Sequence, residues 1–261
     1  MRRVIDLYRY PVKGLSAQRL EFTTLLPGCG FPGDRRWAIT NGTWRYDEAS
    51  YRPRPKIDFL MLMRHEAMAT WATTLDADGR TLRIAEPAGD AICVRSDDAA
   101  DREALSDFVT RHLGTPLAGR PCLVEGRTHR FTDAAIASPE MMSAISLINL
   151  ATVRALGDAL GLTVHPLRFR ANVYFDGGMP FEELDWVGRE LRLGGVRVRV
   201  LSRTRRCAAV NVDPLSGARA LDLVRHLLRQ HGHADVGVYA EVLQGGELRP
   251  NDEVELAAPP T

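Results

Sequence analysis

A single cysteine, Cys207, lies among arginines in the segment "RTRRCAAVNVDP". It follows the alternating run "VRVRVLS" and comes directly after Arg205 and Arg206. Neighbouring cations favour the thiolate, which is the form of cysteine that reacts and that binds soft metals. On a regular strand Arg205 would share a face with Cys207, and Arg206 would point away. The segment predicts a reactive or metal-binding thiol, or else a small side chain buried at the end of a strand.

Anion binding is the second chemistry that the residues suggest. Only Lys13 and Lys56 are lysines among the 34 basic residues. Codon bias alone would explain this composition. An ammonium is, however, a compact point charge that suits a phosphate oxygen, so each remaining lysine raises the question whether an ammonium is specifically needed there. Arg170 and Asn172 would share one face of a strand. Taken singly, each basic residue is more often a solvated surface charge. The candidate anion-binding residues are Lys13, Arg35, Arg36, Arg168 and Arg170.

Several classes of protein are excluded by composition and by missing motifs. The net charge of +1 gives no general attraction to nucleic acid or to an anionic membrane. No apolar run reaches the roughly 18 residues of a spanning helix, and the first residues lack the apolar core of a secretory signal. We therefore expect a cytoplasmic protein. The sequence has no Rossmann or P-loop glycine pattern, no G-x-S-x-G motif, and no histidine or cysteine pair with metal-ligand spacing.

Short strands make up most of the predicted elements, and three helices are inserted among them. Turn residues predict hairpins over 36–47, 70–87 and 189–204. The spacing of apolar residues predicts helices over 100–113, 143–162 and 219–231. Residues 166–177 are predicted as a strand with Arg168 and Arg170 on one face.

The order of these elements favours a mainly β protein with helices, of the α+β class. Strands do not alternate regularly with helices, so an antiparallel barrel or curved sheet with helices packed outside is expected. The loop over 114–140 is the best boundary between parts of the chain. We place the domains at 1–116 and 117–261.

Three segments together resemble one family. "YRYPVKGL" is similar to its Y-P-(V/I)-K-S segment, "RFRAN" to its R-F-R-x-N strand, and "RTRRCAAVNVDPLSG" to its T/S-x-C-x-x-T-x-V-D-P segment. The family is that of the MOSC-domain proteins with an N-terminal MOSC β-barrel domain, which includes the mitochondrial amidoxime-reducing components and their bacterial counterparts. The order of the segments matches, and the resemblance covers essentially the whole chain. It implies a MOSC-type β-barrel packed with an N-terminal MOSC β-barrel domain.

The resemblance also implies a molybdenum cofactor (Mo-molybdopterin), a phosphorylated pterin dithiolene that holds molybdenum. Cys207 matches the family's metal ligand and is the expected catalytic residue. The matched cofactor-binding positions are Lys13, Arg35, Ser138, Arg170, Asn172, Arg205, Arg206 and Tyr239. Pyridoxal phosphate binding is a minor further implication.

This sequence departs from the family pattern at four positions. Gly14 replaces a serine and removes one hydroxyl contact to the cofactor. Ala137 and Asn211 stand where threonines are usual, and Arg205 replaces a small polar residue. These differences leave cofactor binding in place as an expectation and put the substrate preference in doubt.

Three functions are open at this point. The first is a molybdenum-dependent oxidoreductase that reduces N-hydroxylated compounds such as amidoximes, hydroxylamines and N-hydroxylated bases. Some bacterial relatives carry a ferredoxin domain; this chain has no cysteine cluster, so we expect a separate electron-transfer protein of the ferredoxin, flavodoxin or cytochrome type. The second function is a cofactor carrier or a sulfur-transfer protein with a persulfide on Cys207. The third is a thiol redox or binding module without metal, against which the joint presence of Lys13, Arg35, Arg170 and Asn172 argues.

Overall fold

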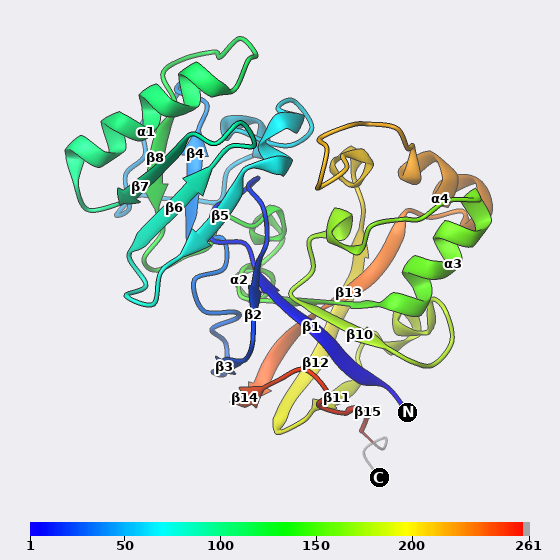
Figure 1. The fold of residues 1–261 in the computed structure, drawn as a ribbon. Coiled ribbons are helices and arrows are strands. Elements are labelled where there is room, and N and C mark those ends of the chain that lie inside the picture. Colours follow the sequence, from blue (N-terminus) through cyan, green and yellow to red (C-terminus); the bar gives the residue numbers. More distant parts are fainter. Residues whose placement is uncertain (258–261) are drawn as a thin grey trace.

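The computed structural model describes residues 1–257 and consists mainly of strands, with four α-helices among the described residues (Figure 1). The strands are β1 (Arg3–Arg9), β2 (Gln18–Leu20), β3 (Thr23–Leu25), β4 (Trp37–Thr40), β5 (Ala72–Leu75), β6 (Thr81–Ala85), β7 (Ala91–Arg95), β8 (Cys122–Glu125), β9 (Ile145–Asn149), β10 (Val173–Asp176), β11 (Glu190–Leu193), β12 (Val196–Arg205), β13 (Asp235–Gln244), β14 (Gly246–Leu248) and β15 (Val254–Leu256). The helices are α1 (Ala99–His112), α2 (Pro139–Met142), α3 (Leu150–Leu160) and α4 (Leu223–His231). The expected α+β class is confirmed.

Eight strands form one curved sheet in the order β15-β11-β12-β13-β9-β10-β1-β2. All neighbours are antiparallel except β9 and β10, which run parallel. The two ends of this sheet approach each other, because Arg3 bridges to Glu253 and the Val4 amide donates to the Asp252 carbonyl at 2.8 Å. The sheet therefore curls into a barrel.

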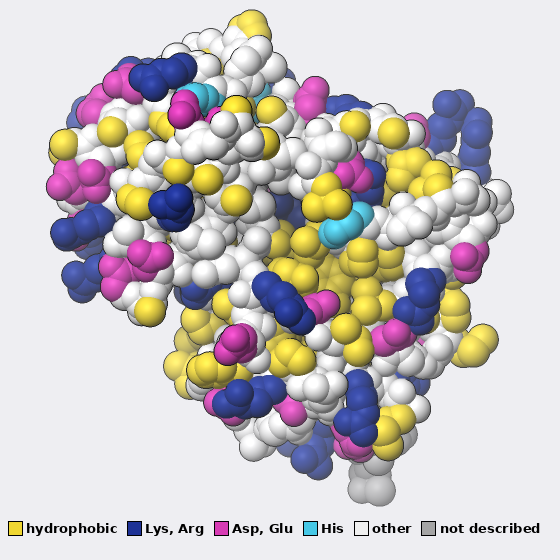
Figure 2. Space-filling view, in the orientation of Figure 1, with side chains coloured by type: hydrophobic (Ala, Val, Ile, Leu, Met, Phe, Trp, Pro, Cys, Tyr) yellow, Lys and Arg dark blue, Asp and Glu magenta, His cyan; other side chains and the backbone are white. Residues whose placement is uncertain are grey.

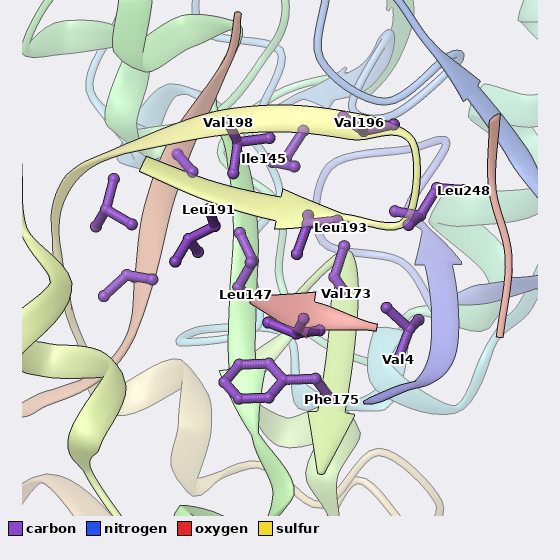
Figure 3. Close-up of a cluster of buried hydrophobic side chains, with 14 of the residues drawn as sticks. Val4, Ile145, Leu147, Val173, Phe175, Leu191, Leu193, Val196, Val198 and Leu248 are labelled. Atoms are coloured by element: carbon purple, nitrogen blue, oxygen red, sulfur yellow. The ribbon is translucent and has the colours of Figure 1, made fainter. Parts of the chain in front are cut away.

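The barrel interior is filled by the apolar residues that alternate along its strands. Leu191 and Leu193 on β11 and Val198 on β12 point inward, while the arginines between them face outward. Figure 3 shows these side chains meeting others from β1, β9 and β10 inside the barrel. Burial of each such side chain stabilises the fold by about 1.5–3 kcal/mol.

The segment from β4 to β8 forms a second body, called here the N-terminal lobe (residues 37–125), on the left of Figure 1. The strands β5, β6 and β7 form a meander, β4 pairs with β8, and α1 packs against β7 and β8. Trp37, Trp71 and Phe108 lie in the core of this lobe. No helix within residues 1–257 has the length and apolar character needed to cross a bilayer.

The first strand of the chain, β1, is part of the barrel sheet and not of the N-terminal lobe. β1 pairs with β10 and belongs to the sheet whose other long strands come after residue 145. Because β1 belongs to the barrel and the chain then continues into the N-terminal lobe, Lys13, just after β1, lies between the two. The domain division at 116/117 stays a prediction.

The strongest local signals in the sequence gave correct elements. The hairpins over 70–87 and 189–204 form as predicted, through β5–β6 and β11–β12. The helix predicted over 100–113 is α1, whose first turn is capped by the Asp98 carboxylate accepting from the Ala100 amide at 2.8 Å.

Four predicted elements were wrong in part. The hairpin over 36–47 does not form, because β4 pairs instead with β8, and Gly42 lies against the backbone of Arg120. The first half of 143–162 is the strand β9; its residues are buried on both faces, and such a run has no period that separates a strand from a helix. Helix α4 begins at Leu223 rather than at 219.

The predicted strand over 166–177 is also shorter than expected. Pro166–Phe169 is a 3-10 turn, and Arg170 has a left-handed backbone with φ 53°. Only Val173–Asp176 form a strand, so Arg168 and Arg170 do not share a strand face.

A buried carboxyl in the barrel domain predicts a measurable pH dependence of stability. Glu183 is fully buried, and the Thr152 hydroxyl lies 3.0 Å from both its oxygens. Burial raises its pKa from 4.5 to about 7. The folded state therefore holds this proton more tightly than the unfolded state, so the stabilisation is complete below pH 4.5 and is lost as the pH rises through 7.

We expect the wild type to lose about 3 kcal/mol of unfolding free energy between pH 4.5 and 8 from this group. The variant Glu183→Gln cannot titrate and should lose correspondingly less. Urea unfolding at pH 5 and pH 8 measures the difference, with the exposed Glu103→Gln as the control. An unchanged pH slope in Glu183→Gln would contradict the assignment.

Candidate functional site

A cavity of about 190 Å³ lies between the barrel and the N-terminal lobe. The segments 13–14, 34–35 and 56–63 contribute one part of its wall, and 168–172 and 204–210 contribute another. Figure 2 shows that hydrophobic side chains gather in the hollow between the two bodies on the face drawn there. A second cavity of about 220 Å³ shares Arg168 and Arg170 with the first.

Basic side chains dominate the wall of the first cavity. Seven basic and two acidic residues line it: Lys13, Arg35, Lys56, Arg168, Arg170, Arg205 and Arg206, with Asp34 and Asp133. Three of the seven form ion pairs, and within residues 1–257 the other four, Lys56, Arg170, Arg205 and Arg206, have no carboxylate partner. Cations removed from water need a counter-charge, so this cavity is a candidate anion site in a chain of nearly neutral charge.

Two arginines lie against one buried tyrosine. The guanidinium carbons of Arg35 and Arg170 are 4.5 and 4.4 Å from the centre of the Tyr10 ring. Arg35 pairs with Asp34 at 2.6 Å and donates to the Arg170 carbonyl at 2.8 Å. Arg170 has no such partner, and burial together with the charge of Arg35 lowers its pKa to about 10. It remains charged at neutral pH and lacks a counter-ion.

The backbone at these two arginines is strained. Arg35 has φ 46° and Arg170 has φ 53°, a left-handed region that side chains other than glycine adopt at a cost of about 1–3 kcal/mol. Such residues occur most often at functional sites, because the strain is kept only where the conformation is needed. The strain therefore supports a role for both arginines beyond packing.

Cys207 lies in the wall of this cavity, half-buried, just before the 3-10 turn Ala208–Asn211. Arg205 and Arg206 line the same cavity, so the expectation that Arg206 points away was wrong. Strand β12 ends at Arg205, and Arg206 instead donates to the carbonyls of Phe169 at 2.7 Å and Val236 at 2.8 Å.

Arg168 is buried beneath the loop that follows Cys207 and binds it through an ion pair and a hydrogen bond. Arg168 pairs with Asp213 at 2.5 Å and donates to the Asn211 carbonyl at 3.0 Å. Asp213 also accepts from the amides of Leu215 and Ser216 and so closes the turn "NVDPLSG". Arg168 holds the loop that carries the thiol.

Asn172 lines the cavity, but its amide is used within the protein. Its Oδ1 accepts from the Ser146 amide at 3.1 Å, and its Nδ2 donates to the Tyr8 carbonyl at 3.2 Å. It therefore connects β1 and β9 at the edge of the cavity. Tyr239 on β13 lies opposite Ser146 in the sheet and also lines the cavity.

The structure brings eight of the nine predicted site residues to one cavity and leaves one out. The eight are Cys207, Lys13, Arg35, Arg170, Asn172, Arg205, Arg206 and Tyr239. Ser138 does not line it; its hydroxyl instead accepts from the Met141 amide at 3.2 Å and caps α2. Which of the eight contact a ligand stays a prediction.

Sequence reasoning did not select several polar residues of this wall. Asp34 and Asp133 provide the counter-charges for Arg35 and Lys13, and no motif marks them. Thr204 is 2% exposed, and its hydroxyl has no hydrogen-bond partner among the described residues. Lys56 was the one with a usable signal, because lysine is so rare in this chain.

Two family profiles match this chain. The profile of the MOSC domain matches residues 110–255, and that of the MOSC N-terminal beta barrel domain matches residues 1–119. The molybdenum cofactor sulfurase of Anopheles gambiae is 29% identical over 270 residues, covering 91% of this chain and 34% of that protein. The human molybdenum cofactor sulfurase is 26% identical over 251 residues, covering 83% of this chain and 27% of that protein.

The chain thus spans about a third of the length of the curated relatives it matches. Among solved structures, the YUAD protein from Bacillus subtilis covers 98% of this chain and 96% of its own, at 14% identity and a TM-score of 0.45. YiiM from Geobacillus stearothermophilus covers 44% of this chain and 54% of its own, at 20% identity and a TM-score of 0.33. Pyridoxal phosphate binding finds no support in these comparisons. From the two profiles, which together span residues 1–255, we conclude that the chain belongs to the MOSC domain family and carries a MOSC N-terminal beta barrel domain.

Proposed function

We propose that the cavity binds a molybdenum cofactor and that Cys207 is the protein ligand of the metal. One observation carries the proposal: a thiol lies in the wall of a cavity where seven basic side chains face two acidic ones. A phosphorylated pterin that holds a soft metal has both features that such a wall would recognise, an anion and a thiophilic centre. Relatives named molybdenum cofactor sulfurases support the same class of ligand.

The residues present fit this group. Arg170 is a half-buried cation without a carboxylate partner among the described residues, and the Thr204 hydroxyl is buried there without a hydrogen bond. Lys13, Arg35 and Arg170 would hold the phosphate and the pterin. Arg206 lines the same cavity as Cys207 and would offset negative charge at the metal.

We further propose that the protein reduces small N-hydroxylated compounds. When bound, the cofactor supplies a metal centre that stores electrons and accepts the oxygen of an N–O bond. Overall, the substrate takes up two electrons and two protons and leaves as the N–H product and water. The electrons come from a separate ferredoxin-, flavodoxin- or cytochrome-type protein, and the open mouth of the cavity admits the substrate.

A second candidate is sulfur transfer, with a persulfide on Cys207, or storage of the cofactor for another enzyme. The names of the curated relatives favour it at least as well as they favour the reductase. The arginines that would hold an anionic cofactor would also stabilise a persulfide anion.

One preparation separates the two candidates. The protein is produced in a molybdate-supplied host, reduced with dithionite and viologen, and offered an aromatic amidoxime, while mass spectrometry examines Cys207. Stoichiometric molybdenum with formation of the amidine supports the reductase. A molybdenum-loaded protein that turns over no N-hydroxylated substrate discards it, and an added sulfur atom on Cys207 without molybdenum supports sulfur transfer.

A further inference from the structure

Both lysines of the chain line the same cavity, although 32 of its 34 basic residues are arginines. They come from distant segments: Lys13 follows β1, and Lys56 begins the 3-10 turn Lys56–Asp58. One carboxylate, Asp133, lines the cavity with both lysines and forms an ion pair with Lys13. Desolvation in the cavity wall raises the pKa of Asp133, and the charges of Lys13 and Lys56 outweigh this effect and lower it. Asp133 is therefore ionised in its pair with Lys13.

The two sides of the Lys13–Asp133 ion pair differ in freedom. The Lys13 side chain is only 11% exposed, and its Nζ is fixed by the Phe131 carbonyl at 3.0 Å as well as by the Asp133 carboxylate. The Asp133 side chain is 55% exposed. Lys56 has no ion pair of its own among residues 1–257. If the pair opens, Asp133 is the partner that moves, and Lys56 is the cation that can receive it.

A phosphate that approaches Lys13 meets a carboxylate already there. Two anions at one ammonium repel each other, so the phosphate gains its contact only as Asp133 leaves. We propose that Asp133 sets the anion affinity of this cavity: it competes with a ligand phosphate for Lys13 and passes to Lys56 when the phosphate binds. The identity of that ligand as the pterin phosphate rests on the proposed function, whereas the competition concerns any phosphate monoester.

The test uses phenyl phosphate as the probe and protein from a host that makes no molybdenum cofactor. Isothermal titration should give a Kd about tenfold lower for Asp133→Asn than for the wild type, because one half-exposed competing charge is gone. In a Lys13→Met background the same Asp133→Asn change should have no effect. Glu103→Gln, which removes an exposed carboxylate paired with Arg120, is the matched control and should leave the Kd unchanged.

Lysine labelled with 13C at Cε gives a second readout, because the chain contributes only two such signals, from Lys13 and Lys56. Titration with phenyl phosphate should shift both signals in the wild type. In Asp133→Asn the Lys13 signal should still shift and the Lys56 signal should stay in place. A Lys56 shift that persists in Asp133→Asn overturns the transfer of the carboxylate.

The competition is overturned if Asp133→Asn binds phenyl phosphate no more tightly than the wild type does. It is also overturned if neither protein binds phenyl phosphate. Both conclusions require that Asp133→Asn unfolds cooperatively, like the wild type. Asp133→Ser replaces it if the asparagine variant does not fold. Failure of the proposed function would give a different result. The wild type from a molybdate-supplied host would contain no molybdenum, while Asp133→Asn would still bind phenyl phosphate more tightly than the wild type.

Discussion

Cys207→Ala is expected to abolish molybdenum retention and to reduce turnover of an N-hydroxylated substrate more than ~100-fold, with the fold intact. The thiol is the one side chain of the predicted site that ligates a soft metal strongly. Within residues 1–257 no hydrogen bond uses this thiol: the Cys207 carbonyl accepts from the Val210 amide at 3.1 Å, and alanine keeps that bond. Because the side chain is small and only half-buried, its loss leaves no large cavity.

Metal and pterin analysis of the two proteins, produced side by side in a molybdate-supplied host, checks this expectation. Cys93→Ala is the matched control, since Cys93 is an exposed cysteine on β7 outside the cavity. Pterin without molybdenum in Cys207→Ala would agree with a cofactor held by the cationic wall. Undiminished molybdenum in Cys207→Ala would show that the metal ligand lies elsewhere.

The elements that the sequence predicted correctly are those with strong local signals. The hairpin at Asp78-Gly79 is set by two residues that favour a tight turn, and α1 by the Asp98 cap and an apolar stripe. The residues of β9 were wrongly predicted as helix, because their burial on both faces depends on β10 and β13, which are far along the chain. The spacing of apolar residues reveals an element only when one of its faces is exposed to solvent, and β9 has no such face.

Site residues that lie in a sequence motif could be predicted, and those that reach the site only through tertiary contacts could not. The three family-like segments contain Lys13, Arg170 and Cys207, and all three line one cavity. The counter-ion Asp133 is 120 residues from Lys13 along the chain, so no local pattern pairs them. The predicted direction of the Arg206 side chain was wrong because the prediction assumed that the strand continues to Cys207, whereas β12 ends at Arg205.

Arg170→Met is expected to strip the pterin from the protein and at the same time to stabilise the cofactor-free fold. Desolvation and the charge of Arg35 disfavour the charged form of Arg170 and lower its pKa from the usual arginine value to about 10. The folded state therefore carries the full cost of this charge at pH 7, and the cost disappears only as the pH rises above 10. Methionine has a similar length, removes the charge, and meets the same backbone strain at φ 53°.

Removing this cost should raise the unfolding free energy of the cofactor-free protein by about 1–3 kcal/mol at pH 7.5, measured in urea. Arg168→Met is the matched control, because Arg168 lies two residues away and is buried, but it is paired with Asp213 at 2.5 Å. Breaking that pair leaves a carboxylate without its partner and should lower the unfolding free energy by about 3 kcal/mol. Opposite signs for two neighbouring arginines would identify Arg170 as a cation kept for its ligand. A destabilised Arg170→Met that still retains pterin would instead make Arg170 a structural residue.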